Sequence, residues 1–330
     1  MVECAFDVAG IGNAIVDVLA YADDAQLQAL GLTKGVMTLV DAERALSIYT
    51  RMGRAVECSG GSAANTVAGV AALGGRAAYI GKVNDDPLGT VFRDDLRRQG
   101  VSFDTPPAIA GQATGRCLIL VTPDAQRTMQ TYLGVSADLE PRDIDADLIA
   151  GAQVTYLEGY LWDPPAAKAA FRKAAAVAHA AGRQVALSLS DPFCVQRHRD
   201  DFLALVAEHV DILFANEDEI TSLYQESLAE ALGRLRQEVR VAAVTRGAKG
   251  SLAVSGDLVI VQDAEPVGAV VDTTGAGDLF AAGFLFGYTK GHGLAECARL
   301  GGLCAAEVIG HIGGRPAVDL AQLVAGVLTV

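Results

Sequence analysis

The sequence predicts an α/β fold with three layers: a doubly wound, mainly parallel sheet between helices, with a small β-sheet inserted as a lid. Two observations predict it. Between residues 154 and 261, short apolar runs typical of strands alternate with longer helix-like segments, as in βαβ units. Earlier in the chain, residues 114–122 and 127–133 alternate apolar and polar positions on either side of a Pro-containing turn, which indicates a hairpin.

The N-terminal elements divide between the main sheet and the lid. Asp41 has the residue type of an N-cap, Ser62 follows a Gly-Gly pair as the N-cap of the next helix, and Pro87 suits the first turn of another. The expected elements are a strand at 5–11, short strands with a brief helix (24–30) within 18–40, helices at 41–50 and 62–73, a strand at 77–81 and a helix at 87–99.

The second half of the chain continues the alternation. Its expected strands lie at 154–157, 184–189, 210–215 and 239–245, with a hairpin at 251–261 and helices at 165–181, up to 208 and up to 237. Because no repeat or low-complexity linker is visible, we expect one large domain that carries the lid. The large domain comprises residues 1–15, 41–113 and 134–330, and the lid comprises residues 16–40 and 114–133.

The composition excludes several classes of protein. A formal net charge of -14 on 330 residues argues against a protein that binds the phosphate backbone of nucleic acids. No apolar run reaches membrane-spanning length without a charge or a glycine, and Asp7 in the N-terminal run argues against a secretion signal. The six cysteines show no metal-site spacing and suit a core. We therefore expect a cytoplasmic globular protein that binds a small molecule, without nucleic-acid or membrane partners.

One late stretch, residues 271–280, combines an apolar strand-like run, three small residues and an acid. The Gly-Ala-Gly segment 275–277 lets backbone N–H groups approach a ligand, and the helix expected at 281–288 adds its positive end. Together they predict an anion site. Asp278 then has two interpretations: it caps the helix, or it accepts a proton from a hydroxyl that attacks a phosphate.

Polar side chains also follow the first predicted strand. Asn13 and Asp17 lie where open α/β sheets bind their ligands, so they either hold two neighbouring hydroxyls or are a turn amide and a solvated acid. Gly10 and Gly12 resemble the start of a dinucleotide fingerprint, but Ile15 stands in place of its third glycine.

The loop at 59–66 leads into a helix through small residues. Gly61 and Ser62 let the backbone approach a ligand or another element, and Asn65 lies one turn into the helix, where it can point at whatever the loop holds. The lysine of a P-loop is absent, so this is not that motif.

Two further turns lie at strand ends. Asn216 and Glu219 share a face at a helix start, and acids near a phosphate indicate magnesium, often through water; alternatively they are a capping amide and a first-turn acid. Thr245, Gly247 and Gly250 form a turn that either lines a nucleotide or closes a hairpin.

Three arginines are candidate phosphate donors, because a guanidinium matches phosphate oxygens, although a typical arginine only decorates the surface. They are Arg116, Arg127 and Arg246.

This combination of motifs resembles the ribokinase-like (PfkB) family of carbohydrate and nucleoside kinases, and within it looks most like the adenosine kinases. The resemblance runs from about residue 6 to residue 316. The segments that match family motifs are 12–17, 60–65, 216–219 and 272–278, and those similar to adenosine kinases are 158–161, 188–193 and 211–219.

The resemblance implies transfer of the γ-phosphate of ATP to the 5′-hydroxyl of a ribonucleoside, from adenosine to AMP as in purine salvage, with Asp278 as the base. The resemblance also implies an anion hole formed by Gly275, Ala276 and Gly277, and a ribose bound by Asn13, Asp17, Gly61, Ser62 and Asn65. The purine would contact Tyr160, Leu161 and lid residues, and ATP would be bound by Arg127, Asn216, Thr245, Gly247, Gly250, Gly313 and Gly314. Glu219 would bind Mg²⁺ through water, and Asp272 and Thr274 would bind K⁺.

Other functions stay open at this point. A kinase of the same family for guanosine, inosine or a free sugar such as ribose or fructose would keep the same base and anion hole. A nucleoside or sugar sensor without catalysis would not need an intact Asp278. A Rossmann-type dehydrogenase is disfavoured by the missing third glycine. A lid can cover the site alone or pair between subunits, so both a monomer and a homodimer are compatible with the sequence.

Overall fold

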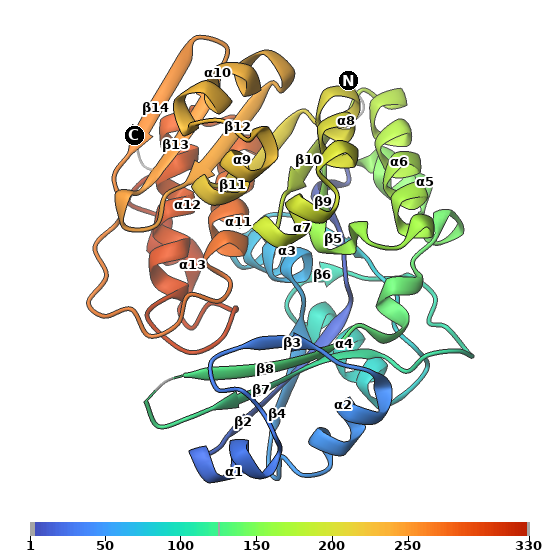
Figure 1. Ribbon diagram of the computed structural model, residues 1–330. Helices are drawn as coiled ribbons and strands as arrows, with labels where there is room; N and C mark the ends of the chain where they lie inside the picture. The colour runs from blue at the N-terminus through green and yellow to red at the C-terminus, as the bar shows by residue number, and fades with distance from the viewer. Residues whose placement is uncertain (1–3, 125, 329–330) are drawn as a thin grey trace.

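The computed structural model describes residues 4–124 and 126–328, and this part of the chain forms two β-sheets (Figure 1). Ala125, in the predicted lid hairpin, lies outside the described residues. The larger sheet and most helices occupy the upper part of Figure 1, and the smaller sheet lies below them. Within the same described ranges, no helix is long and apolar enough to cross a lipid bilayer.

Nine strands form the main sheet of the described chain. In spatial order they are β14 (Leu258–Gln262), β13 (Ser251–Ser255), β12 (Val241–Thr245), β11 (Ile212–Asn216), β10 (Gln184–Ser188), β9 (Ala152–Glu158), β1 (Phe6–Ile11), β5 (Ala77–Ile80) and β6 (Val101–Ser102). All neighbours from β12 to β6 are parallel, and β13 and β14 close one edge as the predicted antiparallel hairpin.

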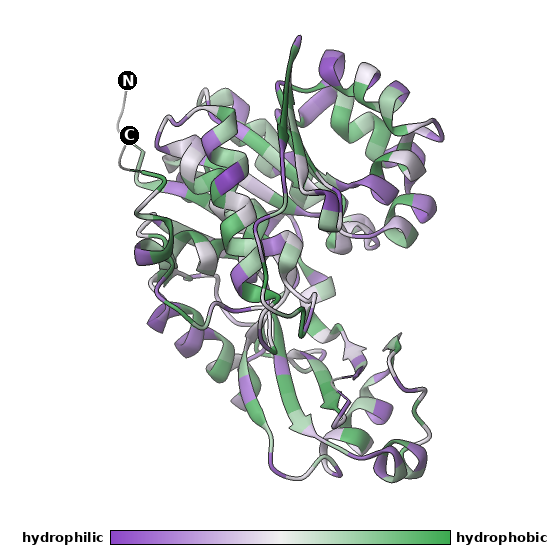
Figure 2. Ribbon diagram, turned by 90° about the vertical axis from the view of Figure 1, so that its left-hand side faces the viewer, coloured by the Kyte–Doolittle hydropathy of each residue, from purple (hydrophilic) through white to green (hydrophobic). Residues whose placement is uncertain are grey.

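Side chains of the parallel strands alternate between two apolar cores, because successive residues of a strand point to opposite faces. Val8 and Tyr156 face one core, whereas their neighbours Ala9 and Leu157 face the other. Helices cover both faces, so the predicted three-layer α/β fold is confirmed; Figure 2 shows one end of the sheet nearly edge-on between them. The first core is covered by α3 (Ser62–Ala72), α11 (Ala276–Thr289), α12 (Leu294–Val308) and α13 (Leu320–Val324), and the second by α5 (Ala146–Gly151), α6 (Pro165–Ala180), α7 (Pro192–Arg197), α8 (Arg199–His209), α9 (Glu217–Tyr224) and α10 (Leu228–Glu238).

The smaller sheet, which corresponds to the predicted lid, has five strands within the described ranges. Their order is β3 (Met37–Leu39), β8 (Arg127–Tyr132), β7 (Gly115–Val121), β2 (Ile15–Tyr21) and β4 (Val56–Gly60), and α1 (Asp24–Ala29), α2 (Ala42–Tyr49) and α4 (Pro87–Arg98) pack beside them. The antiparallel pair β7–β8 is the predicted lid hairpin.

The predicted boundary between lid and large domain at residue 41 is wrong. β4 pairs with β2, and α2 contacts β7 and β8, so residues 42–60 belong with the small sheet. The sequence Val-Glu-Cys-Ser-Gly of β4 contains one β-branched residue and no aromatic one, so its local composition does not indicate a strand. Pairing with β2 forms it.

Two predictions at helix starts are also wrong. α11 begins at Ala276 rather than at residue 281, and the apolar run at 270–271 before it is not a strand. The N-cap of α3 is Gly61, with a φ of 95°, and Ser62 is the first residue of the helix. In contrast, Asp41 caps α2 as predicted, since its side chain accepts from the Arg44 amide.

Four segments of the described chain connect the two sheets, and we call them the crossing segments. Residues 12–14 lead from β1 into β2, residues 61–63 from β4 into α3, residues 103–114 from β6 into β7, and residues 133–136 out of β8. The first of them lies at the carboxyl end of β1, which is the edge where open α/β sheets bind ligands. The site is therefore expected between the two sheets.

Candidate active site

The predicted anion site lies at the start of α11. Gly275 is the N-cap, and its φ of 76° is a conformation that favours glycine. The Ala276 amide, predicted to join the anion hole, instead donates to the Thr273 carbonyl at 3.2 Å. The amides of Gly277 and Asp278 have no partner within the helix, because they belong to its first turn, so they can donate to an anion.

Asp278 is held by two donors from α3. Ser62 Oγ donates to one carboxylate oxygen at 2.6 Å and Asn65 Nδ2 donates to the other at 2.8 Å. Burial raises the pKa of Asp278, while these two hydrogen bonds and the Arg315 charge act against the rise. Since the N-cap of α11 is Gly275, the capping interpretation of Asp278 is not supported, and a half-buried carboxylate next to an anion site suits a base.

Gly275→Ala is expected to lower the free energy of unfolding by about 1–3 kcal/mol, the usual range for a strained backbone conformation. The new Cβ would lie 2.7 Å from Gly314 Cα, and the φ of 76° disfavours any residue other than glycine. Gly277→Ala is the matched control, because its Cβ would meet no atom within 4 Å. Thermal unfolding of both variants checks this expectation, and equal melting temperatures would contradict it.

Asp17 faces the site from β2. Within residues 4–124 and 126–328, its carboxylate accepts no hydrogen bond, and Gly60 leaves room for it, since a Cβ there would lie 2.4 Å from a carboxylate oxygen. Burial raises the pKa of Asp17 to about 6, Arg315 and Arg127 oppose the rise, and the Asp278 charge adds to it. Asp17 and Asp278 therefore belong to one site, and Asp17 is free to accept from a ligand.

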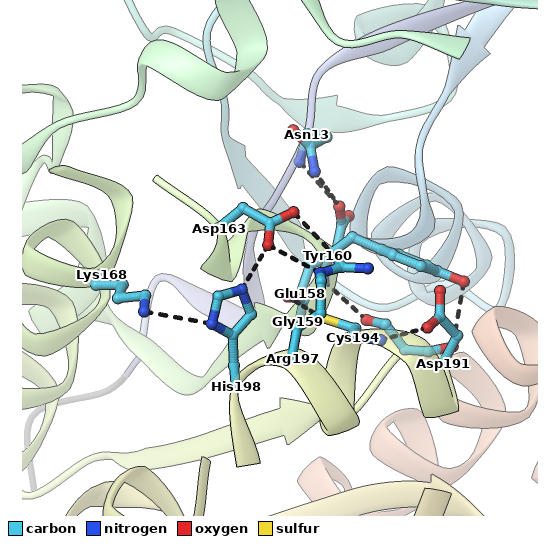
Figure 3. Close-up of polar contacts among 11 residues, drawn as sticks. Asn13, Glu158, Gly159, Tyr160, Asp163, Lys168, Asp191, Cys194, Arg197 and His198 are labelled. Carbon is cyan, nitrogen blue, oxygen red and sulfur yellow. Dashed lines mark hydrogen bonds and ion pairs between the residues drawn. The ribbon is translucent and has the colours of Figure 1, made fainter. Parts of the chain in front are cut away.

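Asn13, predicted to bind ribose, is instead enclosed in the protein with 3% exposure. Its Nδ2 donates to Glu158 Oε1 at 2.9 Å (Figure 3). Its Oδ1 accepts from Ser136 Oγ at 3.0 Å. The amide is thus used within the protein. Gly61 is needed for the same packing, because a Cβ there would lie 2.3 Å from the Asn13 carbonyl oxygen.

Of the two residues outside the lid that were predicted to contact the purine, Tyr160 and Leu161, only Tyr160 is accessible. Tyr160 is 39% exposed, whereas Leu161 is 1% exposed in the second core, so the prediction for Leu161 is wrong. The Tyr160 hydroxyl donates to the Ser190 carbonyl at 3.2 Å and its amide donates to Ser190 Oγ at 3.1 Å. Ser190 has a φ of 73°, which is uncommon outside glycine and is typical of functional sites. Figure 3 shows the Tyr160 ring extending from the end of β9.

Arg127, on β8, reaches the anion-site loop but is already paired there. Its guanidinium forms an ion pair with Asp272 and donates to Thr274 Oγ1 at 2.7 Å. Asp272 also accepts from the amides of Thr274 at 3.0 Å and Gly313 at 2.9 Å. The residues predicted to hold potassium therefore hold the Arg127 guanidinium instead, and Arg127 joins the small sheet to the large domain.

Asn216 and Glu219 form a capping box at the start of α9. Asn216 caps the Glu219 amide at 2.8 Å, and the two Glu219 oxygens accept from Asn216 Nδ2 at 2.7 Å and its amide at 3.0 Å. Burial raises the pKa of Glu219 to about 7. Direct coordination of a metal by Glu219 does not fit this geometry, but each carboxylate oxygen keeps a further lone pair for a water molecule.

The turn after β12 has the structure of a hairpin closure. The Gly250 amide donates to the Gly247 carbonyl at 3.0 Å, and a Cβ on Gly250 would lie 2.0 Å from the Gln262 carbonyl oxygen. Thr245 lies beside Asn216 at the carboxyl edge of the sheet. Arg246 donates to the Lys249 carbonyl in this turn, and Arg116 lies between Tyr49 and Tyr132, so neither is placed as a phosphate donor.

Two charges of the site, buried Glu158 and half-buried Arg315, were not predicted. Glu158 ends β9 and binds Asn13, and Arg315 donates to the Ala64 carbonyl at 2.7 Å and the Ser59 carbonyl at 2.9 Å. Gly314 lets the loop approach Asn65, since a Cβ there would lie 2.9 Å from its Nδ2. The only sequence signal was for Glu158, which lies within the segment 158–161 that resembles adenosine kinases.

A groove of about 450 Å³ lies beside the anion-site loop. One wall is the segment 265–269, and the other is α12 with Leu303, Ala306 and Glu307. The Ile309 carbonyl at the end of α12 accepts from the Val271 amide at 2.8 Å, so the groove and the anion-site loop share a border. No sequence pattern pointed to this groove.

A carboxylate held next to an anion site meets the main requirement for transferring a phosphate to a hydroxyl group, and comparison with known proteins places the chain in that class of enzyme, the phosphotransferases. The chain belongs to the pfkB family of carbohydrate kinases, whose model matches residues 29–320. Kinases of this family use ATP with a divalent metal ion.

Known relatives include enzymes for different acceptors. An adenosine kinase from Sinorhizobium meliloti is 53% identical, with a TM-score of 0.90, and the match covers 98% of this chain and 99% of that one. A probable sugar kinase from Rhizobium etli is 49% identical, with a TM-score of 0.91 and coverage of 98% and 100%. A fructokinase from Klebsiella pneumoniae is 31% identical over 255 residues, 74% of this chain and 81% of the fructokinase. The protein is thus a sugar or nucleoside kinase of the pfkB type.

Proposed function

We propose that the protein transfers the γ-phosphate of ATP to the 5′-hydroxyl of adenosine and so makes AMP, a step of purine salvage. The observation that carries the proposal is the exposed ring of Tyr160, whose hydroxyl is anchored on Ser190, near the charges of Asp278 and Glu158. A purine base can stack on an aromatic ring held in one orientation, whereas a free sugar has no ring system that stacks in this way. The 53% identity with an adenosine kinase supports the same acceptor.

In the proposed reaction, Asp17 accepts hydrogen bonds from two neighbouring ribose hydroxyls and positions the nucleoside. Asp278 accepts the proton of the 5′-hydroxyl. At the same time the 5′-oxygen of the nucleoside bonds to the γ-phosphorus, and the bond from that phosphorus to ADP breaks. The amides of Gly277 and Asp278 donate to the phosphate oxygens, where negative charge develops. The small sheet covers this site and limits the access of water, which would otherwise accept the phosphate.

The donor nucleotide would extend from the anion site into the groove between residues 265–269 and α12. Its apolar wall suits a nucleobase. Gly310 lines the groove, and Gly313 further along the same loop donates to Asp272 beside the anion site. Thr245 and Gly247, at the carboxyl edge of the sheet, are proposed to flank the same nucleotide. A magnesium ion, when bound, would offset the charge of the phosphates, and Glu219 would hold one of its water ligands. Since Arg127 occupies Asp272 and Thr274, the proposed reaction uses no potassium ion at these two residues.

A free sugar is the second candidate acceptor, because a fructokinase is among the relatives. The deciding experiment measures ATP consumption by the purified protein with magnesium and potassium. Adenosine, inosine, guanosine, ribose and fructose are supplied separately. The proposal predicts a strong preference for adenosine. A preference for fructose or ribose would contradict the nucleoside assignment and keep the role of Asp278, and activity with none of the five would favour a sensor.

Tyr160→Ala is expected to raise the KM for adenosine by about tenfold, because a stacked aromatic pair is worth about 0.5–1.5 kcal/mol beyond its buried area. Tyr160→Phe is the matched control, since it keeps the ring and loses only the bond to Ser190. We expect its KM to stay within about threefold of the wild-type value, the change that loss of one ordinary hydrogen bond brings. Equal KM values for the alanine variant and the wild type would remove the stacking argument.

A further inference from the structure

Glu158 is a buried acid to which the proposed reaction gives no role. It lies at the carboxyl end of β9 and is 1% exposed. Its Oε1 accepts from the Asn13 amide at 3.1 Å and from Asn13 Nδ2 at 2.9 Å, and its Oε2 accepts from the Ala63 amide at 2.8 Å. Glycine is required at position 12 to admit the carboxylate, because a Cβ there would lie 2.3 Å from Oε2.

These donors come from two different crossing segments, and a third segment is joined through Asn13. Asn13 lies where the chain enters the small sheet, and Ala63 lies just after it leaves that sheet through β4. Ser136, which donates to Asn13 Oδ1 at 3.0 Å, lies where the chain leaves the small sheet through β8. The Val135 amide donates to the Ala113 carbonyl at 3.0 Å, which brings in the fourth crossing segment.

The same carboxylate is connected to both functional acids of the site. Ala63 follows Ser62, whose hydroxyl holds Asp278 at 2.6 Å. Asn13 stands just before β2, the strand that carries Asp17. A shift of Glu158 would therefore move the strand with Asp17 relative to the helix that holds Asp278. An error of about 1 Å between such groups can cost a factor of about 100 in rate.

A purely structural role is the simpler alternative, since buried acids are usually satisfied by hydrogen bonds. Yet an acid is a costly choice for a buried position, because its charge must leave water. Two acceptor oxygens without any hydrogen are needed here, since three N–H donors converge from two segments. A glutamine would present its own N–H₂ to one of those donors.

We infer that Glu158 is a positioning residue that joins the crossing segments of the small sheet and so fixes Asp17 relative to Asp278. This inference rests on the proposed function for its kinetic consequence, but its structural part does not depend on which acceptor is used. Figure 3 shows Glu158 pointing toward Asn13, away from the cluster of Asp163 and His198.

The test compares Glu158→Gln with Asp7→Asn and Ser136→Ala in the full-length protein. Asp7 is a matched control, because it is another buried acid (3% exposed). It lies at the amino end of β1, far from the Asn13 end, and binds Arg76 and Lys290. Amide hydrogen exchange is measured without ligands. In Glu158→Gln we expect faster exchange at Asn13 and Ala63, and also at Val135, which does not bond to Glu158. In Asp7→Asn these amides should exchange as in the wild type.

The kinetic arm measures the acceptor and ATP constants separately. In Glu158→Gln the KM for the acceptor is expected to rise by roughly tenfold or more, as for a misplaced binding group, while the KM for ATP stays within about twofold. Ser136→Ala should act in the same direction with a smaller effect. The double variant should fall short of the sum of the two effects, because both residues act through Asn13.

Three results would overturn the inference. The first is unchanged exchange at Val135 in Glu158→Gln, and the second is faster exchange at the same amides in Asp7→Asn. The third is a raised acceptor KM in Glu158→Gln, with no rise in Ser136→Ala and fully additive effects in the double variant. The last result would mean that Glu158 contacts the acceptor directly. If the wild type phosphorylates none of the acceptors, the proposed function fails, and hydrogen exchange alone then decides the positioning role.

Discussion

Asp278→Asn is expected to lower turnover by about 100-fold or more, the usual effect of removing a general base. The asparagine has nearly the same shape and can still accept from Ser62 Oγ, and the Asn65 amide can turn to offer its carbonyl oxygen to the new N–H₂, so binding of ATP and acceptor should persist. It cannot take the proton of the attacking hydroxyl, because an amide is not basic at neutral pH. Single-turnover kinetics together with equilibrium binding of both ligands separate the two effects.

The result that would contradict this role is turnover close to that of the wild type. A suitable control is Ser62→Ala, which removes one of the two donors to Asp278 but leaves the carboxylate in place. If Asp278 is the base, this variant should lose less turnover than Asp278→Asn. Equal losses would indicate that the geometry of the loop, and not proton transfer, limits the rate.

Asp17→Asn is expected to have two effects of opposite sign: weaker acceptor binding and a more stable protein at high pH. Burial raises the pKa of Asp17 from 3.8 to about 6 in the folded protein. Below pH 3.8 both folded and unfolded forms are protonated, so burial of this group costs nothing. As the pH rises toward 6 the unfolded form loses its proton first, and stability falls until the folded form has also lost its proton.

The asparagine variant avoids this loss, so its melting temperature should exceed that of the wild type by an amount that grows from about pH 4 to about pH 6 and stays constant at higher pH. We expect an advantage of about 1–2 kcal/mol at the upper end, since one pKa unit corresponds to about 1.4 kcal/mol and the site is partly open to water. Asp257→Asn, at an exposed position, is the control and should show no such trend. A lower melting temperature for Asp17→Asn at pH 8 would contradict an unpaired carboxylate.

The sequence was most informative where local chemistry is unusual. The segment from Gly275 to Asp278 combines small residues with an acid at a helix start, and the structure places it as expected, although the helix begins earlier. The alternation of strands and helices predicted the three layers, because strands and helices each have their own period of apolar residues. Such signals depend on neighbours in the chain.

Features that depend on contacts between distant segments were not predictable. β4 has no strand-like composition and forms through pairing with β2. Asn13 looked like a ligand residue because it follows a strand, but Glu158 and Ser136, far along the chain, use its amide. Leu161 and Tyr160 are adjacent, yet one faces the core and the other the surface, and the short 3₁₀ helix that contains them (Gly159–Trp162) gave no periodic signal.

The two acids of the site belong to different parts of the molecule, and this has an evolutionary consequence. Asp278 and its donors lie on α11 and α3 of the large domain, whereas Asp17 lies on the separate small sheet. Mutations in the small sheet that leave the crossing segments in place can change which acceptor is held without moving Asp278 and its donors. A family with this arrangement can change its acceptor through mutations in the small sheet while selection preserves the large domain. This agrees with the presence of a fructokinase and an adenosine kinase among the relatives of this chain.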